Sequence, residues 1–252
     1  MIFEHPTVEQ LPQLIKLWNA VFGDWNGFWE TFLETGFSCD RCRCVLDNNR
    51  ITAALTWLDC SCEGQKMAYI YAVVTDPAHR GQGLCRQLLA DTHKILKGQG
   101  YTGALLVPAD ENLRAMYEKM GYRTCTQVEE FDAVSGPAPV SFRAIGGEEF
   151  ARLRRRFLPA SGIVQEQENL AFLSRQAQFF VGEDFLLTAY TEEKQLTAME
   201  LLGNKAAAPG ILRALDCRKG RFRCPGKNIP FAMIHVLTND TIIPEYFGFA
   251  FD

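Results

Sequence analysis

The sequence lacks any long apolar run. No stretch of the 252 residues approaches the ~20 consecutive apolar residues that cross a bilayer. The first residues also lack the basic segment followed by an apolar one that marks a secretory signal. We therefore expect a cytoplasmic protein with no membrane partner.

An excess of positive charge and a paired-cysteine framework are also missing. The net charge is −4, which gives no basic footprint for nucleic acid. Nine cysteines in a chain without a secretion signal predict reduced thiols rather than disulfides. The acidic excess lies in residues 1–134, which carry 17 acidic and 12 basic side chains and would tolerate or attract a cationic molecule such as an amine.

Length and composition predict a soluble globular protein large enough for two domains. Hydrophobic residues make up 47% of the chain and charged residues 22%, which is ordinary for such a protein. The clearest break in composition is Ser135-Gly136-Pro137-Ala138-Pro139. We therefore expect one domain over residues 1–134 and a second, smaller one over residues 140–252.

One segment carries the strongest motif. Residues 69–75 are apolar, β-branched and aromatic and predict a buried strand, Asp76-Pro77 ends it, and residues 84–96 have helical spacing. The loop between them contains Gly81 and Gly83. A helix N-terminus presents unpaired N–H groups and glycines allow close backbone approach, so the loop is predicted to bind an anion, most often a phosphate.

Two segments resemble those of the GNAT superfamily of N-acetyltransferases. Residues 80–85, Arg-Gly-Gln-Gly-Leu-Cys, resemble its pyrophosphate loop, Arg/Gln-x-x-Gly-x-Gly/Ala, with Cys85 in place of the last small residue. Residues 112–122 resemble its Asn-x-x-Ala-x-x-x-Tyr/Phe-x-x-x-Gly-Phe/Tyr segment, with Tyr117 five residues after Asn112. The spacing fits neither dinucleotide nor nucleoside-triphosphate loops. The resemblance covers roughly the first half of the chain.

The resemblance implies an α/β (α+β) fold, with a mixed, mostly antiparallel twisted sheet flanked by helices. The second half repeats the order of helices and strands without the glycine loop, which predicts a degenerate, non-catalytic GNAT-like domain of the tandem type. Arg218-Lys219-Gly220-Arg221 would be a poor substitute for the loop. The second domain is expected to shape the acceptor pocket or a homodimer.

The cofactor implied by the resemblance is acetyl-CoA. The amides of residues 82–85 would hold its pyrophosphate, Arg80 and Gly81 would shape the turn, and Asn112 would contact the pantetheine or cap a helix. The edge of the central strand would pair with the pantetheine amides. These expected cofactor-binding residues are Val73, Val74, Thr75, Arg80, Gly81, Gln82, Gly83, Leu84, Cys85 and Asn112.

The reaction implied is direct attack of a primary amine on the acetyl group in a ternary complex. Tyr117 matches the residue that protonates the departing thiolate, and its alternative role is packing against the cofactor. The base stays open, with the carboxylate of Asp252 as one candidate. A non-catalytic acyl-CoA sensor is the alternative function. The sequence selects neither the acceptor nor the length of the acyl chain.

Three further features have two interpretations each. Phe22, Trp25, Phe28 and Trp29 are either acceptor contacts or, as we favour, core residues. The cysteines between residues 39 and 62 form either a zinc site or, as we favour, a set of small core residues, so no metal is expected. The arginines between residues 152 and 156 bind the 3′-phosphate of coenzyme A or, as we favour, form a solvated helix face.

Overall fold

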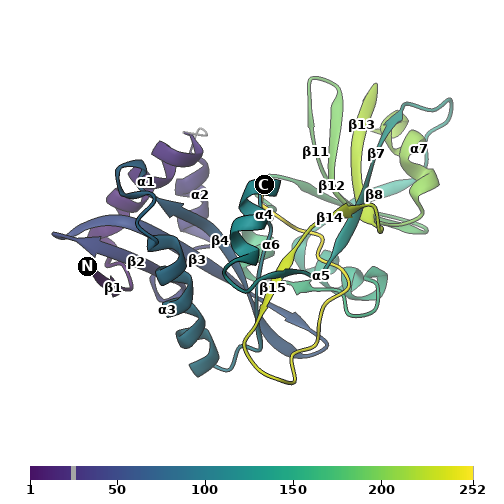
Figure 1. The fold of residues 1–252 in the computed structure, drawn as a ribbon. Coiled ribbons are helices and arrows are strands. Elements are labelled where there is room, and N and C mark those ends of the chain that lie inside the picture. Colours follow the sequence, from purple (N-terminus) through teal and green to yellow (C-terminus); the bar gives the residue numbers. More distant parts are fainter. Residues whose placement is uncertain (24–26, 252) are drawn as a thin grey trace. The chain divides into compact units, whose positions relative to one another are not determined.

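The computed structural model describes residues 1–23 and 27–251, so Trp25 and Asp252 lie outside the described residues. The chain divides into two compact units. The first comprises Met1–Leu106, Asp110–Arg123 and Ile234–Ile242, and the second comprises Val107–Ala109, Thr124–Met233 and Ile243–Asp252. Each unit contains a mixed, mostly antiparallel sheet with helices against it, which confirms the expected fold class (Figure 1).

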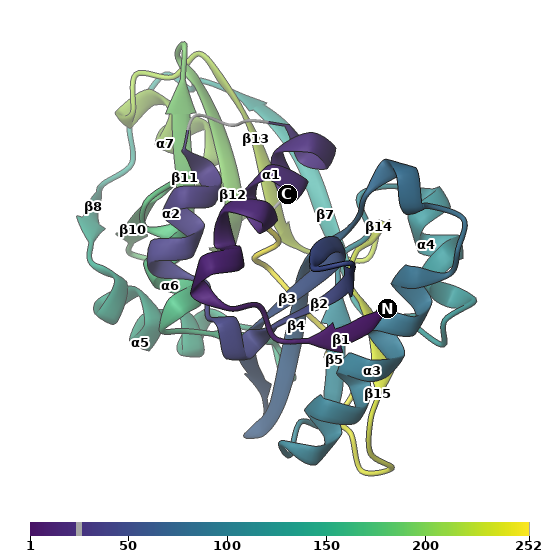
Figure 2. The ribbon, with the colours of Figure 1, turned by 90° about the vertical axis from the view of Figure 1, so that its left-hand side faces the viewer.

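The sheet of the first unit has the order β1-β2-β3-β4-β5-β15-β6. Its strands are β1 (Ile2–Glu4), β2 (Cys42–Asp47), β3 (Arg50–Cys62), β4 (Gln65–Thr75), β5 (Gly103–Leu106), β6 (Arg123–Thr124) and β15 (Met233–Val236). Its helices are α1 (Leu11–Phe22), α2 (Phe28–Thr35), α3 (Leu84–Gly98) and α4 (Glu111–Glu118). Helices α1 and α2 cover one face of this sheet and α3 covers the other (Figures 1 and 2).

Local sequence explains most of these elements. Asn48 and Asn49 have φ angles of 49° and 62°, as the tight two-residue turn of the β2–β3 hairpin requires. Thr7 caps a single 3₁₀ turn (Val8–Gln10), and its N–H donates to Oε1 of Gln10 over 2.8 Å. Helix α1 begins directly after this turn. Helix α1 buries Leu14, Leu17 and Trp18 against the sheet.

Strand β4 is the irregular strand of the first sheet. It pairs antiparallel with β3 along its length but parallel with β5 only from Met67 to Tyr69. Opposite β3, the register shifts by one residue near Ala72, which has a φ of 50°. Such a bulge bends a strand and re-aims its side chains. The second half of β4 therefore lies beyond the ladder that it forms with β5.

The sheet of the second unit has the order β14-β7-β13-β12-β11-β10-β8. Its strands are β7 (Gln127–Val134), β8 (Phe142–Ile145), β10 (Gln178–Gly182), β11 (Phe185–Glu192), β12 (Gln195–Gly203), β13 (Lys219–Pro225) and β14 (Ile229–Pro230). The unit also contains the short strand β9 (Val164–Gln165) and the helices α5 (Gly147–Phe157), α6 (Glu168–Leu173) and α7 (Ala208–Ala214). Helix α7 packs on an apolar cluster that includes Leu187, Leu196 and Phe222 on one face of the sheet.

The division into units differs from the boundary expected at residues 135–139. Strand β7 lies within residues 1–134, the expected first domain, but it pairs with β13 and so belongs to the second sheet. Conversely, Ile234–Ile242 returns to the first unit. Composition marks the glycine- and proline-containing break after β7, but strand pairing between distant segments decides where each unit ends.

The sequence pattern predicts a strand over residues 246–251 and none over residues 219–225, and the structure contradicts both. Residues 246–251 form no strand, because the backbone of Phe249 bonds with the side chain of Gln165 instead of a neighbouring strand. Strand β13 was missed because its charged residues resembled a loop. Its alternation of buried Phe222 and Cys224 with Arg221 and Arg223 was the signal.

Candidate active site

The glycine loop forms an open cradle at the start of α3. Gly81 and Gly83 have φ angles of 76° and 75°, which side-chain-bearing residues rarely adopt, and Gly83 caps the helix. The first helical bond runs from the N–H of Gln87 to the carbonyl of Gly83 over 3.1 Å. The N–H groups of residues 84–86 therefore have no acceptor within the helix. Gly81, Gln82 and Gly83 are exposed.

This geometry fits an anionic group. A Cβ built on Gly81 meets no atom within 4 Å, so the space over the loop is open. The fifteen residues of α3 align their peptide dipoles behind it and concentrate partial positive charge at its N-terminus. Backbone N–H groups beside a helix N-terminus are the usual partners of phosphates in proteins.

Charged residues beside the loop hold its entry in place. The guanidinium of Arg80 donates to the carbonyl of Thr75 over 3.4 Å and so ties the loop to the end of β4. Asp76 accepts a bond from the N–H of Ala78 and pairs with Arg50 over 2.8 Å. The bond from Ala78 is the main reason that the pKa of Asp76 lies below its usual value. Asp76 is therefore an ionised loop cap.

The predicted cofactor strand lies beside this loop. Val74 and Thr75 pair with β3, and both lie beyond the three residues that β4 pairs with β5. Val73 is the residue next to the bulge at Ala72. The structure therefore brings Val73–Thr75 and the glycine loop together at one end of β4. The bulge itself carried no signal in the sequence.

Tyr117 lies on α4 near the first turn of α3. Its side chain is buried, and burial followed by the nearby Cys85 raises its pKa well above the usual value. Burial also raises the pKa of Cys85 to about 11, so this residue stays a thiol. The ring of Tyr117 packs edge-on against Tyr122 at 5.7 Å. Tyr117 is therefore a protonated phenol fixed beside the residue that ends the loop motif.

Asn112 is not the cap of its helix. The side chain of Asp110 occupies that role and accepts a bond from the N–H of Leu113 over 2.8 Å. Asn112 follows in the first turn of α4 and is exposed. Of the two roles expected for Asn112, the capping role is wrong and the cofactor contact stays a prediction.

A histidine pair lies behind Tyr117 and was missed by sequence analysis. His93 on α3 stacks on His235 of β15 at 4.0 Å, and its Nε2 hydrogen-bonds with the hydroxyl of Tyr122 over 2.8 Å. Burial, with a smaller contribution from His235, lowers the pKa of His93 to about 3. Nothing local in the sequence indicates that residue 235 returns to the first sheet.

This pair predicts loss of stability in acid. The folded state keeps His93 neutral, whereas the unfolded chain binds a proton there near pH 6.5. The contribution of His93 to the free energy of unfolding is therefore fully present above pH 7 and is lost as the pH falls from 6.5 toward 3. We expect the first unit to lose about 3 kcal/mol from this group between pH 7 and pH 4. Urea titrations followed by tryptophan fluorescence measure it, since all four tryptophans lie within residues 1–60. His93→Gln should flatten the pH dependence, and an unchanged slope would contradict this assignment.

The aromatic side chains of α1 and α2 pack mainly into the core. Trp29 is buried, and its ring stacks on that of Trp18 at 4.8 Å between centroids. The ring of Phe28 packs edge-on against Trp29 at 5.0 Å. Phe22 keeps 38% of its surface exposed and packs against Trp29 at 5.5 Å. The core interpretation is therefore correct for Trp29, and Trp25 lies outside the described residues.

The cysteines do not gather into a ligand set. The sulfurs of Cys42 and Cys44 are buried 3.9 Å apart, and the thiol of Cys60 donates to the carbonyl of Met67 over 3.4 Å. Among residues 1–23 and 27–251, no group of three or more metal-binding side chains was found. Cys42, Cys44, Cys60 and Cys62 are therefore small buried side chains, whereas Cys39 is partly exposed.

The basic run on α5 is only partly a solvated face. Arg152 and Arg155 are mostly exposed and pair with Glu149 and Glu166. Arg154 contradicts both interpretations, because it is 2% exposed and forms a bidentate ion pair with the equally buried Glu200. A buried arginine inside an arginine run cannot be recognised from composition.

Comparison with known proteins identifies the family to which the first part of the chain belongs. Residues 3–125 match the family model described as "Acetyltransferase (GNAT) domain". This part of the chain is a GNAT acetyltransferase domain. Its glycine loop, splayed β4 and Tyr117 lie within the matched residues. GNAT proteins transfer acyl groups from acyl-CoA, so the chain contains an acyltransferase domain. No curated protein matches the sequence.

Solved structures share the fold over nearly the whole chain. A GCN5-related N-acetyltransferase from Kribbella flavida is 18% identical with a TM-score of 0.70, over 93% of this chain and 70% of that one. One from Anabaena variabilis is 15% identical with a TM-score of 0.72, over 94% and 73%. A tandem GNAT protein from the clavulanic acid biosynthesis pathway is 13% identical with a TM-score of 0.57, over 95% and 99%. At these identities the likeness establishes the fold alone.

Within the described ranges, the structure has no helix both long and apolar enough to cross a membrane.

Proposed function

We propose that this protein transfers an acetyl group from acetyl-CoA directly to a primary amine while both are bound. One observation carries the proposal. The glycine loop at the N-terminus of α3 opens beside the part of β4 that has separated from β5. A phosphate site and a free strand edge thus lie next to each other. Acetyl-CoA needs both, because its pyrophosphate requires an anion site and its pantetheine arm carries amides that can pair with a strand.

The chain's own groups would hold the two ends of the cofactor. The N–H groups of residues 82–85 would bind its pyrophosphate, supported by the dipole of α3 and by Arg80. The backbone of Val73, Val74 and Thr75 would pair with its pantetheine amides as an added strand does. Asn112, exposed in the first turn of α4, would contact the same arm. Acetyl-CoA, when bound, supplies the activated acetyl group.

Tyr117 would hold the proton that the leaving thiolate takes up. A general acid must be protonated at the working pH, and the raised pKa of Tyr117 keeps its hydroxyl in that form. Cys85 stays a thiol at neutral pH, so it is a poor nucleophile for an acyl-enzyme. This supports direct transfer. The base that accepts the proton of the amine is left unassigned, and Asp252 stays a candidate.

The experiment that tests the function is a transfer assay with a panel of amines. The panel contains a small aliphatic amine, an aminoglycoside, an amino acid and a peptide with a free N-terminus. Thiol reagents would also react with the partly exposed Cys39, Cys85 and Cys125, so the readouts are loss of thioester absorbance and product mass. Acetylated product from any amine is the expected result. Binding of acetyl-CoA without product from any of them would favour the sensor function.

A further inference from the structure

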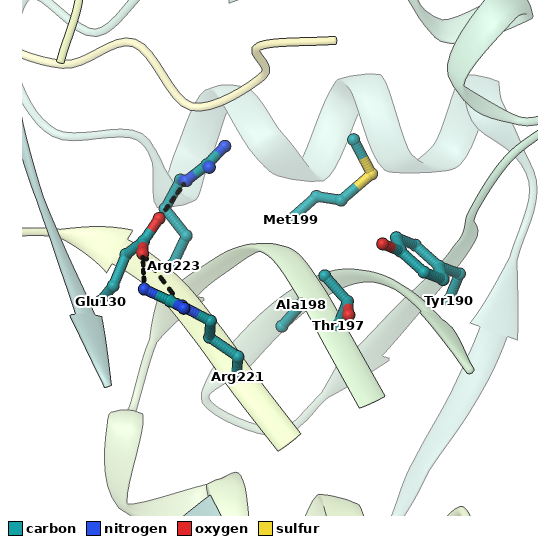
Figure 3. A pocket seen from close by; sticks show the side chains of 7 residues that line it. All are labelled: Glu130, Tyr190, Thr197, Ala198, Met199, Arg221 and Arg223. Atoms are coloured by element: carbon teal, nitrogen blue, oxygen red, sulfur yellow. Dashed lines mark hydrogen bonds and ion pairs between the residues drawn. The ribbon is translucent and has the colours of Figure 1, made fainter. Parts of the chain in front are cut away.

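A cavity lies in the second unit, on the face of its sheet opposite α7. Its volume is about 200 Å³. Six side chains from four adjacent strands point into it, as Figure 3 shows: Glu130 of β7, Tyr190 of β11, Thr197 and Met199 of β12, and Arg221 and Arg223 of β13. The apolar cluster under α7 uses the alternate residues of the same strands.

The cavity opens where β12 and β13 separate. Strand β12 pairs antiparallel with β11 and parallel with β13, as β4 does with β3 and β5. The parallel ladder ends at Ala198 and Phe222. In the ladder between β12 and β11, Ala198 pairs with Ala189 and Glu200 pairs with the next residue, Thr188. Met199 has no partner in this ladder and is the extra residue of a bulge. The second unit therefore repeats the splayed and bulged strand of the acetyltransferase domain.

The connection after β12 differs from the connection after β4 in the first unit. Strand β12 leads through a 3₁₀ turn (Lys205–Ala207) into α7, which has only seven residues. No glycine loop comparable to residues 80–85 stands there. A pyrophosphate would therefore find no cradle at this opening, and side chains rather than backbone amides determine what can bind.

One wall of the cavity is positively charged. The carboxylate of Glu130 lies between the two arginines and accepts bonds from Nε and Nη2 of Arg221 and from Nε of Arg223 (Figure 3). Burial acts to raise the pKa of Glu130, but these arginines lower it below the usual value, so the group is ionised. The wall thus carries one net positive charge.

The two arginines differ in their access to solvent, and so in their ability to bind a ligand. Arg223 is 15% exposed and also packs over the ring of Phe231 at 4.7 Å, so it is fixed in place. Arg221 keeps 67% of its side chain exposed, so the outer edge of its guanidinium reaches solvent. A planar guanidinium matches the two oxygens of a carboxylate.

The facing wall is amphipathic. Tyr190 and Thr197 are directly opposed across β11 and β12, and each brings a hydroxyl. The bulge turns the thioether of Met199 toward the same space (Figure 3). The Tyr190 ring and Met199 give an apolar surface, while the hydroxyls supply donors. A ligand here would meet charge at one end and an apolar surface at the other.

We propose that this cavity binds a small organic monocarboxylate, with its carboxylate on Arg221 and its apolar body against Met199 and Tyr190. The volume is below the roughly 300–1,000 Å³ of clefts that hold drug-sized ligands, which fits a molecule of amino-acid size. The single net charge favours a monoanion over phosphate, because Glu130 repels a second negative charge. This site does not depend on acetyl transfer.

The test uses methyl NMR of the whole protein labelled at its six methionines. The Met199 signal is assigned with Met199→Leu, and the probes are benzoate, its uncharged analogue benzamide, acetate and inorganic phosphate. Benzoate should shift the Met199 methyl saturably with a Kd on the order of 1 mM, as suits so small a ligand. Arg221→Gln should weaken benzoate at least tenfold. Tyr190→Ala should weaken benzoate more than acetate.

The matched control is Arg152→Gln, which removes another exposed arginine that faces a glutamate in the same unit. It should leave the Kd for benzoate within twofold. The proposal is overturned if Met199 shows no saturable shift, if benzamide binds as well as benzoate, or if phosphate binds more tightly. Equal weakening by Arg152→Gln and Arg221→Gln would also overturn it, because general charge would then explain the binding. Tyr190→Ala keeps the test valid should Arg221→Gln not fold.

Discussion

Replacing Tyr117 with phenylalanine should lower kcat for amine acetylation at least 100-fold while leaving KM for acetyl-CoA within about threefold. General acids typically contribute on the order of 10² to 10⁴ in rate. The phenol is buried, lies beside Cys85 and keeps its proton because burial raises its pKa. Phenylalanine preserves the packing against Tyr122 and removes only the hydroxyl, so the loss should fall on the chemical step. Steady-state kinetics with a responsive amine measures both constants.

Tyr122→Phe is the matched control. It removes a neighbouring hydroxyl that bonds with His93 over 2.8 Å, so it should lower stability but keep kcat within about threefold. If Tyr117 only packs against the cofactor, Tyr117→Phe would leave kcat unchanged. A raised KM with unchanged kcat would therefore contradict the acid role. Because the pKa of Tyr117 lies well above 10, wild-type activity should also show no loss from this group up to pH 9.

Replacing Glu200 with alanine should destabilise the second unit by about 3–5 kcal/mol, the usual cost of leaving one partner of a buried ion pair alone. Glu200 and Arg154 are 1% and 2% exposed. Arg154 also donates to the carbonyl of Ile163 over 3.0 Å and stacks over Phe249 at 4.3 Å. A Cβ on Gly248 would overlap the carboxylate of Glu200, so the backbone at Gly248 lies directly against the ion pair of Glu200 and Arg154. An unpaired guanidinium there has no access to water.

The two units can be followed separately in this experiment. All four tryptophans lie within residues 1–60, so their fluorescence reports the first unit, whereas far-ultraviolet circular dichroism reports both. For Glu200→Ala, circular dichroism should show an additional unfolding transition at a lower urea concentration, and tryptophan fluorescence should not show it. The double variant Arg154→Met with Glu200→Leu should recover much of the loss. Asp216→Asn, which breaks the exposed pair with Lys194, should leave both transitions unchanged. Equal effects of Glu200→Ala and Asp216→Asn would contradict the account.

The sequence was sufficient for the parts of the site that are local. Gly81 and Gly83 have the left-handed backbone that only glycine adopts readily, so the positions of the glycines in the sequence predict the loop. The helix of Tyr117 is likewise closed by Gly121 of the motif, which has a φ of 89°, whereas its N-terminal cap is Asp110 and not the expected Asn112. Such features depend on neighbours in the chain, and pattern analysis finds them.

The parts that were missed depend on contacts between distant segments. The bulge at Ala72 is a shift in the register of β4 against β3, and it follows the point where β4 leaves β5. His235 reaches His93 only because β15 joins the first sheet. Arg154 looked like its exposed neighbours, and only its bond to Glu200 on β12 distinguishes it. No local pattern encodes a partner that lies tens of residues away.

The central claim is that the glycine loop at α3 binds acetyl-CoA, and calorimetric titration tests it most directly. Wild-type protein is titrated with acetyl-CoA beside Gly83→Glu, which puts a side chain and a negative charge into the loop at a φ of 75°. The control is Gly98→Glu, the same change at the exposed far end of α3, where a Cβ meets no atom within 4 Å. We expect binding to wild type and Gly98→Glu, and none to a folded Gly83→Glu. Absence of binding to the wild type, or equal binding to all three, would contradict the claim.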